Sequence, residues 1–193
     1  MTVRIISGER RGTKLRTPEG WDTRPLRGRA REALLNILRP SIVDAIVLDA
    51  FAGSGAVGLE ALSNGAAWVT FVEPEPEAAR CLEWNVDRLR YGQQCELLEG
   101  HSPAMLSRAR PPRTPVDLVL LMPPYHSGLC TAVLGSEELA PLVSEGTLAV
   151  CEVHRSEDLL LPPGWECDDE RLYGITRLAF VRRTSLPAGP DGA

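Results

Sequence analysis

Short runs of hydrophobic residues recur along the chain, and in the segments between these runs hydrophobic residues lie three or four positions apart. Short apolar runs predict buried strands, and apolar residues three or four positions apart predict helices. The predicted strands span residues 46–50, 68–73, 95–99, 116–121 and 147–153. The predicted helices span residues 56–64, 75–90, 102–109 and 130–143. Alternation of this kind predicts a parallel sheet with helices on both faces.

The end of the chain breaks the alternation. Residues 166–172 and 176–182 predict two antiparallel strands joined by a tight turn at Tyr173-Gly174-Ile175. An α/β core closed by a terminal hairpin is typical of the Rossmann-like class I methyltransferase fold. We therefore expect a mostly parallel, seven-stranded sheet that ends in this hairpin.

The start of the chain is basic. Residues 3–6 and 13–16 predict a small β-hairpin, and a helix is expected from about residue 27 to 38. Residues 1–39 hold ten Arg and Lys against four acids, although the whole chain has a net charge of −5. A basic arm on an acidic body favours one face for a polyanion, with a solvated arginine-rich surface as the alternative. The expected units are a basic extension (1–39), a catalytic domain (40–184) and a disordered tail (185–193).

Composition narrows the class of protein further. The length of 193 residues fits one domain of ordinary size. The five cysteines are widely spaced and include no C-x-x-C pair, which argues against a zinc site or a disulfide framework. The sequence has no apolar run of membrane-spanning length and no apolar signal segment at its start. We expect a cytoplasmic protein without a bound metal.

A loop of small residues follows the first predicted strand. It begins after Asp49 and has the spacing Gly53-x-Gly55-x-x-Gly58. Glycines allow a sharp turn and the close approach of a ribose or phosphate. The spacing alone also fits a dinucleotide site, or a turn that binds nothing. The expected cofactor-binding residues here are Asp49, Phe51, Ala52, Gly53, Ser54 and Gly55.

Two more predicted strands end near candidate cofactor contacts. Glu73 ends the second strand, where a carboxylate can accept both hydroxyls of a ribose. His101 follows the third strand, near the expected position of an adenine ring. Alternatively, Glu73 is an exposed acid at the end of a strand and His101 is a structural histidine, with no ligand at either residue. An acid before the loop can face a cationic ligand, which favours S-adenosylmethionine over a nicotinamide cofactor.

The sequence Met122-Pro123-Pro124-Tyr125 follows the fourth predicted strand and is the main candidate for catalysis. Consecutive prolines fix φ and remove two N–H donors, so their carbonyls point rigidly and one can accept a hydrogen bond from an amine. Tyr125 can stack on a base that has left its helix. Taken alone, the motif also fits a Pro-Pro turn with a packing tyrosine. Together with the glycine loop it predicts methyl transfer to an exocyclic amine.

The sequence resembles the RsmD-like family of bacterial 16S rRNA guanine-N2 methyltransferases over about residues 3–183. The motifs that carry the resemblance are Arg4-Ile5-Ile6-Ser7-Gly8, Arg11-Gly12-Thr13-Lys14-Leu15, Arg24-Pro25, Arg31-Glu32-Ala33-Leu34-Leu35-Asn36, Phe51-Ala52-Gly53-Ser54-Gly55 and Pro123-Pro124-Tyr125. The resemblance implies a guanine amine of 16S rRNA in the 30S subunit as target, S-adenosylhomocysteine as product, and a monomeric enzyme. The expected RNA-binding residues are Arg4, Arg10, Arg11, Lys14, Arg24, Arg27 and Arg31.

Three positions depart from the family pattern. Met122 stands where the family has Asp, and a thioether is a weak acceptor for the target amine. Losing one such partner costs on the order of 2–4 kcal/mol in the barrier, by analogy with a lost oxyanion donor. Leu26-Arg27-Gly28 replaces a Thr-Thr-Asp segment, and His101 replaces an Asp or Asn.

These departures leave two further hypotheses beside the active rRNA methyltransferase. One is a homologue that binds S-adenosylmethionine and RNA with weak or no transfer. The other is an amino-methyltransferase with a different target, such as a DNA adenine or a protein glutamine.

Overall fold

The computed structural model describes residues 3–19 and 28–185. The roles predicted for Arg24 and Arg27, and most of the expected disordered tail, lie outside the described residues. Among the residues that are described, no helix combines the length and apolar character needed to cross a membrane.

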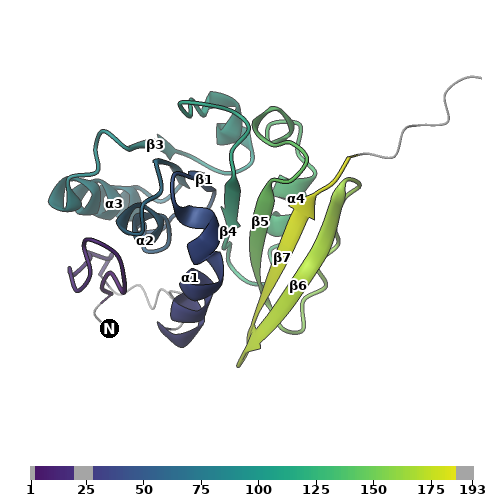
Figure 1. The fold of residues 1–193 in the computed structure, drawn as a ribbon, viewed down its shortest axis with the longest axis horizontal. Helices are drawn as coiled ribbons and strands as arrows, with labels where there is room; N and C mark the ends of the chain where they lie inside the picture. The colour runs from purple at the N-terminus through teal and green to yellow at the C-terminus, as the bar shows by residue number, and fades with distance from the viewer. Residues whose placement is uncertain (1–2, 20–27, 186–193) are drawn as a thin grey trace, which may run out of the picture.

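A seven-stranded sheet forms the centre of the molecule (Figure 1). Its strands are β1 Ile46–Asp49, β2 Trp68–Glu73, β3 Cys95–Glu99, β4 Leu118–Leu121, β5 Leu148–His154, β6 Trp165–Tyr173 and β7 Thr176–Arg183. They lie in the order β3-β2-β1-β4-β5-β7-β6. The first five strands are parallel, and β7 runs antiparallel to both β5 and β6. The predicted mostly parallel sheet with a terminal hairpin is confirmed.

Helices cover both faces of this sheet (Figure 1). The helices are α1 Gly28–Ile42, α2 Gly58–Ser63, α3 Pro76–Leu89 and α4 Leu129–Leu134, with 3-10 turns at Ala104–Arg108 and Ala140–Leu142. The core clusters place α1, α2 and α3 on one face and α4 on the other.

Two of the predicted helices are wrong in part. The segment predicted at 130–143 ends its α-helix at Leu134, because Gly135 follows as the C-terminal cap, and resumes only as a 3-10 turn. The segment predicted at 102–109 forms a 3-10 turn that begins after Pro103.

The start of the chain differs from the expected hairpin. Its two arms run antiparallel, and the N–H of Leu15 donates to the carbonyl of Val3 at 3.0 Å. Regular strands are absent from residues 3–19, where a single β-bridge joins Arg4 and Lys14. The boundary expected between residues 39 and 40 falls inside α1, which continues through Pro40 to Ile42.

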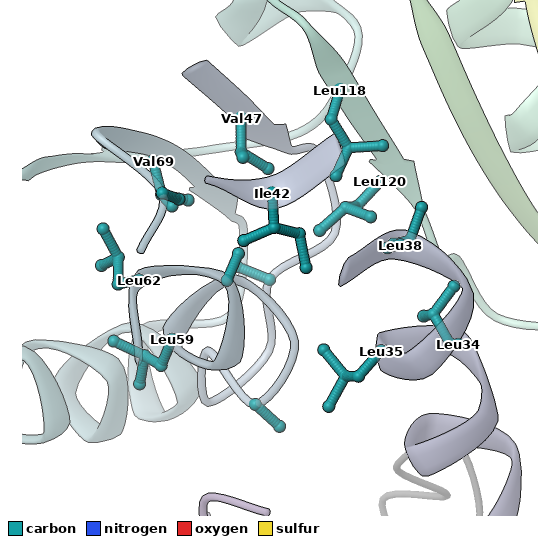
Figure 2. Close-up of a cluster of buried hydrophobic side chains, with 14 of the residues drawn as sticks. Leu34, Leu35, Leu38, Ile42, Val47, Leu59, Leu62, Val69, Leu118 and Leu120 are labelled. Carbon is teal, nitrogen blue, oxygen red and sulfur yellow. The ribbon is translucent and has the colours of Figure 1, made fainter. Parts of the chain in front are cut away.

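The core between α1, α2 and the sheet fixes the first part of the chain to the rest of the fold. Figure 2 shows α1 and α2 pointing leucines toward apolar residues of β1, β2 and β4. The labelled residues of this cluster are Leu34, Leu35, Leu38, Ile42, Val47, Leu59, Leu62, Val69, Leu118 and Leu120. Because strand residues alternate between faces, Leu48 and Val119 pack into the separate core beneath α4. Because β1 to β5 run parallel, their carboxyl ends meet at one edge of this sheet.

Candidate active site

The loop between β1 and α2 places its glycines in different surroundings. Gly55 has a φ of +82°, and a Cβ there would lie 2.3 Å from Cδ1 of Leu82. A Cβ on Gly58 would lie 2.3 Å from Cε1 of the fully buried Phe71. Gly53 has a φ of +56°, and no atom of the described residues lies within 4 Å of a Cβ built on it. Gly55 and Gly58 thus allow close packing, whereas Gly53 borders open space that a ligand can enter.

Glu73 ends β2 with its carboxylate against this loop. Its Oε2 accepts a hydrogen bond from the N–H of Gly53 at 2.6 Å, and its Oε1 accepts one from the N–H of Glu75 at 2.9 Å. The Glu73 carbonyl accepts the N–H of Gly100 at 3.0 Å, which brings exposed His101 to the same edge. Burial raises the pKa of Glu73. Each carboxylate oxygen keeps a second lone pair for a ligand hydroxyl.

Asp49 lies beneath the loop, with its side chain almost fully buried. Its Oδ2 accepts the N–H of Gly58, the first residue of α2, at 3.1 Å. Burial raises the pKa of Asp49 to about 7. Asp49 therefore shapes the turn into α2, and its contact with a cationic ligand stays a prediction.

The other predicted cofactor residues are held by the surrounding strands and helices. The N–H of Ala52 donates to the carbonyl of Val72 at 3.0 Å, which ties the loop to β2. Phe51 is half-buried and packs against the core beneath α4. The carbonyl of Ser54 accepts a hydrogen bond from Nδ2 of Asn85 in α3 at 2.9 Å. Contacts with β2, with α3 and with the core beneath α4 thus hold the predicted loop in place.

The Met122-Pro123-Pro124-Tyr125 motif follows β4 and lies next to the glycine loop, because β4 pairs with β1. The thioether side chain of Met122 is half-buried and packs against the core beneath α1. Pro123 is buried, Pro124 is exposed and Tyr125 is half-buried. The structure therefore brings the predicted cofactor and catalytic residues to one edge of the sheet.

The Tyr125 hydroxyl lies among side chains that the sequence did not single out. It lies 2.9 Å from Oε1 of Glu152 in β5 and 2.6 Å from Oγ1 of Thr176, the first residue of β7. Its ring makes an edge contact with the ring of His154, with centroids 5.6 Å apart. These residues lie 27 to 51 positions from Tyr125 in sequence, so no local motif pointed to them.

The predicted RNA-binding residues fall into two groups. Exposed side chains on the N-terminal segment are those of Arg4, Arg11 and Lys14. Arg10 is half-buried, and its guanidinium carbon lies 5.7 Å from the ring centroid of Tyr91. Arg31, also predicted to bind RNA, does not share this exposure. Its side chain is buried, its Nη2 donates to the carbonyl of Arg4 at 2.8 Å, and burial lowers its pKa.

Two buried polar residues hold the N-terminal segment on α2 and α3. The carboxylate of Glu60 in α2 accepts the N–H groups of Ile6 at 2.5 Å and Ser7 at 3.3 Å. Asn85 exchanges hydrogen bonds with the backbone of Arg16, at 2.7 Å and 2.9 Å. Sequence reasoning missed both residues, although an acid inside the apolar helix of Glu60 was a usable signal. Asn85 also holds Ser54, so the basic segment and the glycine loop share one anchor.

The class of protein follows from four features: the order of the strands, the glycine loop, the acid at the end of β2 and the Pro-Pro-Tyr motif. Together they define a class I methyltransferase. Ligands of such sheets bind at the carboxyl ends of the strands. The family model described as Conserved hypothetical protein 95 matches residues 3–182, so the chain belongs to that family.

Named relatives agree with this assignment. The chain is 35% identical over 182 residues to Ribosomal RNA small subunit methyltransferase D of Escherichia coli, covering 94% of this chain and 90% of the relative. It is 34% identical over 175 residues to the Haemophilus influenzae protein of the same name, covering 90% of each. A solved structure described as a putative methyltransferase, yhhF, from Escherichia coli superimposes with a TM-score of 0.81 at 32% identity, covering 96% of this chain and 99% of that one.

Proposed function

We propose that this protein transfers the methyl group of S-adenosylmethionine to the exocyclic N2 amine of a guanine in 16S rRNA of the small ribosomal subunit. S-adenosylhomocysteine is the other product. The observation that carries the proposal is the meeting of the glycine loop and the Pro-Pro-Tyr motif at one sheet edge, in a family whose named relatives act on ribosomal RNA of the small subunit. We also propose that the enzyme is monomeric and cytoplasmic and that it needs no metal.

The residues around the glycine loop fit S-adenosylmethionine. This cofactor supplies a methyl group made electrophilic by its sulfonium. Gly53 leaves room for its close approach, and the two Glu73 oxygens have lone pairs for ribose hydroxyls. His101 lies near Glu73 and is available to an adenine ring. Asp49 supplies a carboxylate beneath the loop, where a cation would favour its ionised form.

The motif after β4 acts on the target amine. The pyrrolidine rings of Pro123 and Pro124 fix the backbone φ at both residues, which limits the directions of their carbonyls. The Pro123 carbonyl is the proposed acceptor for an N–H of the amine. Tyr125 offers a ring face on which a flipped base can stack. Holding the amine at a fixed place beside the methyl donor is the main source of acceleration in this proposal.

The exposed basic residues of the N-terminal segment form the proposed RNA contact. Arg4, Arg11 and Lys14 project from a segment whose backbone is anchored on α2 and α3. Lysine and arginine bind phosphates with an affinity that falls as salt rises. The segment would therefore hold the subunit in a fixed position relative to the catalytic edge.

The test is transfer of labelled methyl from S-adenosylmethionine to 30S subunits prepared from cells that lack this protein. Free 16S rRNA and 50S subunits serve as comparison substrates. We expect label in the 30S reaction only, and a strongly reduced rate of labelling with the Tyr125→Ala variant. Label in 50S subunits, or none with any substrate, would contradict the proposal.

Met122 favours one second candidate, a homologue that binds S-adenosylmethionine and RNA without transferring the methyl group. That candidate predicts normal binding of the cofactor and of 30S subunits by calorimetry and sedimentation, with no label in the rRNA. Transfer to a DNA adenine or a protein glutamine instead would identify a different amino-methyltransferase.

A further inference from the structure

Glu152 places a buried carboxylate at the target side of the site. It lies in β5 with 7% of its surface exposed, and its Oε1 is 2.9 Å from the Tyr125 hydroxyl. Thr176 lies 2.6 Å from the same hydroxyl. Burying a carboxylate is costly unless its charge is compensated, and the hydrogen bond from Tyr125 compensates it only in part.

The sheet register puts this carboxylate beside Met122. Leu121 of β4 pairs with Cys151 of β5 in parallel register, so Met122 and Glu152 follow at neighbouring positions. Leu121 and Cys151 both pack into the core beneath α4. Because side chains alternate along a strand, Met122 and Glu152 both project to the opposite face. Glu152 on β5 therefore places a carboxylate beside Met122, the position at which the family resemblance leads us to expect an acid.

Glu152 still has capacity to accept hydrogen bonds. An ionised carboxylate has about four lone-pair sites, and Tyr125 uses one of them, on Oε1. Within the described part of the chain, Oε2 makes no hydrogen bond. Burial raises the pKa of Glu152 to about 7, so the group can take up a proton near neutral pH.

We infer that Glu152 accepts hydrogen bonds from the target amine, and so performs in this chain the role that Met122 cannot. This inference rests on the function proposed above. Guanine offers the N1–H and the N2 amine side by side, which suits one carboxylate. When N2 forms a bond to the methyl carbon of S-adenosylmethionine, the bond between that carbon and the sulfonium sulfur breaks. The sulfur keeps the electron pair of the broken bond, which gives S-adenosylhomocysteine. The N–H bond that breaks on N2 gives its proton to Oε2 of Glu152.

The first test compares single and double variants by steady-state methylation of 30S subunits. Glu152→Gln keeps the size of the side chain and the acceptor for Tyr125 but removes the charge. We expect its kcat to fall about 100-fold with little change in KM for the subunit. Tyr125→Phe should cost less than Glu152→Gln. Met122→Asp should raise the kcat of the Glu152→Gln variant by a larger factor than it raises that of the wild type. Glu166→Gln, on exposed β6, is the matched control.

Three results would overturn the inference. Equal losses for Glu152→Gln and Tyr125→Phe, with no further loss when both substitutions are combined in one protein, would mean that Glu152 only holds the tyrosine. An equal gain from Met122→Asp in both backgrounds would mean that the two positions do not share a role. An unchanged kcat for Glu152→Gln would also contradict it.

A binding measurement separates this inference from the proposed function. It uses S-adenosylhomocysteine-loaded protein and a short single-stranded RNA that carries one guanine, or inosine in its place. Inosine lacks the 2-amino group, so the wild type should bind the guanine RNA more tightly, and Glu152→Gln should lose that preference. A preference that depends on Glu152 in a protein without transferase activity would support the inference while the proposed function fails. A preference that Glu152→Gln leaves intact, or no preference in the wild type, would overturn the inference.

Discussion

The two sides of the site are built in different ways. On the cofactor side, the Glu73 carboxylate accepts the backbone N–H groups of Gly53 and Glu75, and the residues lie at the ends of β1 and β2 or in the loops directly after β1 and β3. On the target side, Tyr125 is held by side chains from β5 and β7. Backbone-built sites depend on glycine and turn geometry, so their sequence pattern is local. A site built from side chains of distant strands is defined only by the fold.

The largest expected effect is on the cofactor side, from Gly58→Ala. The added Cβ would lie 2.3 Å from the buried Phe71 ring and 2.9 Å from Oδ2 of Asp49. We expect a loss of about 2–4 kcal/mol in the free energy of unfolding and loss of S-adenosylmethionine binding. Urea unfolding and calorimetry measure the two effects. Gly92→Ala is the matched control, since a Cβ there meets no atom of the described residues within 4 Å.

The converse change on the target side is Tyr125→Ala. Stacking of one base on an aromatic ring contributes about 1–3 kcal/mol, so kcat/KM for 30S subunits should fall about 10- to 100-fold. Calorimetry should show unchanged affinity for S-adenosylmethionine. A matching loss of cofactor affinity would contradict the division of the site into two sides.

A third prediction concerns pH and the buried carboxylate of Glu152. Its pKa is raised to about 7 in the folded protein, against about 4.3 in an unfolded chain. The folded state therefore holds a proton that the unfolded state has lost, so this group's contribution to stability is lost as pH rises from about 4 through 7.

Replacing Glu152 by Gln removes this pH dependence. Between pH 5 and pH 8.5, the stability of Glu152→Gln relative to wild type should rise by about 2–3 kcal/mol in urea unfolding. A relative stability that does not change with pH would show that Glu152 titrates normally.

The smallest expected effect lies on the RNA surface, in Lys14→Ala. Lys14 is exposed, and a single phosphate contact contributes little to a large interface. We expect a two- to threefold weaker affinity for 30S subunits, about the size of one lost ion pair, and a salt-dependence slope lower by about one. Binding measured over a series of salt concentrations tests this. An unchanged slope would exclude Lys14 from the RNA contact.

Sequence alone predicted the sheet and the turn between β1 and α2 well. The positions of β1, β2 and β3 agree with the predicted strands within one residue, and a polar residue ends each of them, at Asp49, Glu73 and Glu99. The glycine spacing and the acid at the end of β2 predicted the loop, because each signal is local. Contact of these residues with a cofactor is still a prediction.

The sequence could not predict the surroundings of Tyr125 or the burial of Arg31. Glu152 and Thr176 reach the tyrosine only through the pairing of β4 with β5 and of β5 with β7. Arg31 belongs to a basic cluster in the sequence, yet α1 turns its side chain toward the carbonyl of Arg4. Charge patterns do not encode which face of a helix a neighbouring segment covers.

The most direct test of the central claim is nucleoside analysis of 16S rRNA after the purified protein has methylated 30S subunits with labelled S-adenosylmethionine. The account predicts that the label is recovered as N2-methylguanosine from a single nucleotide, that Glu73→Ala abolishes it, and that Tyr125→Ala lowers its rate of incorporation about 10- to 100-fold. Label in any other nucleoside, or no label from a protein that binds both S-adenosylmethionine and the subunit, would contradict the account.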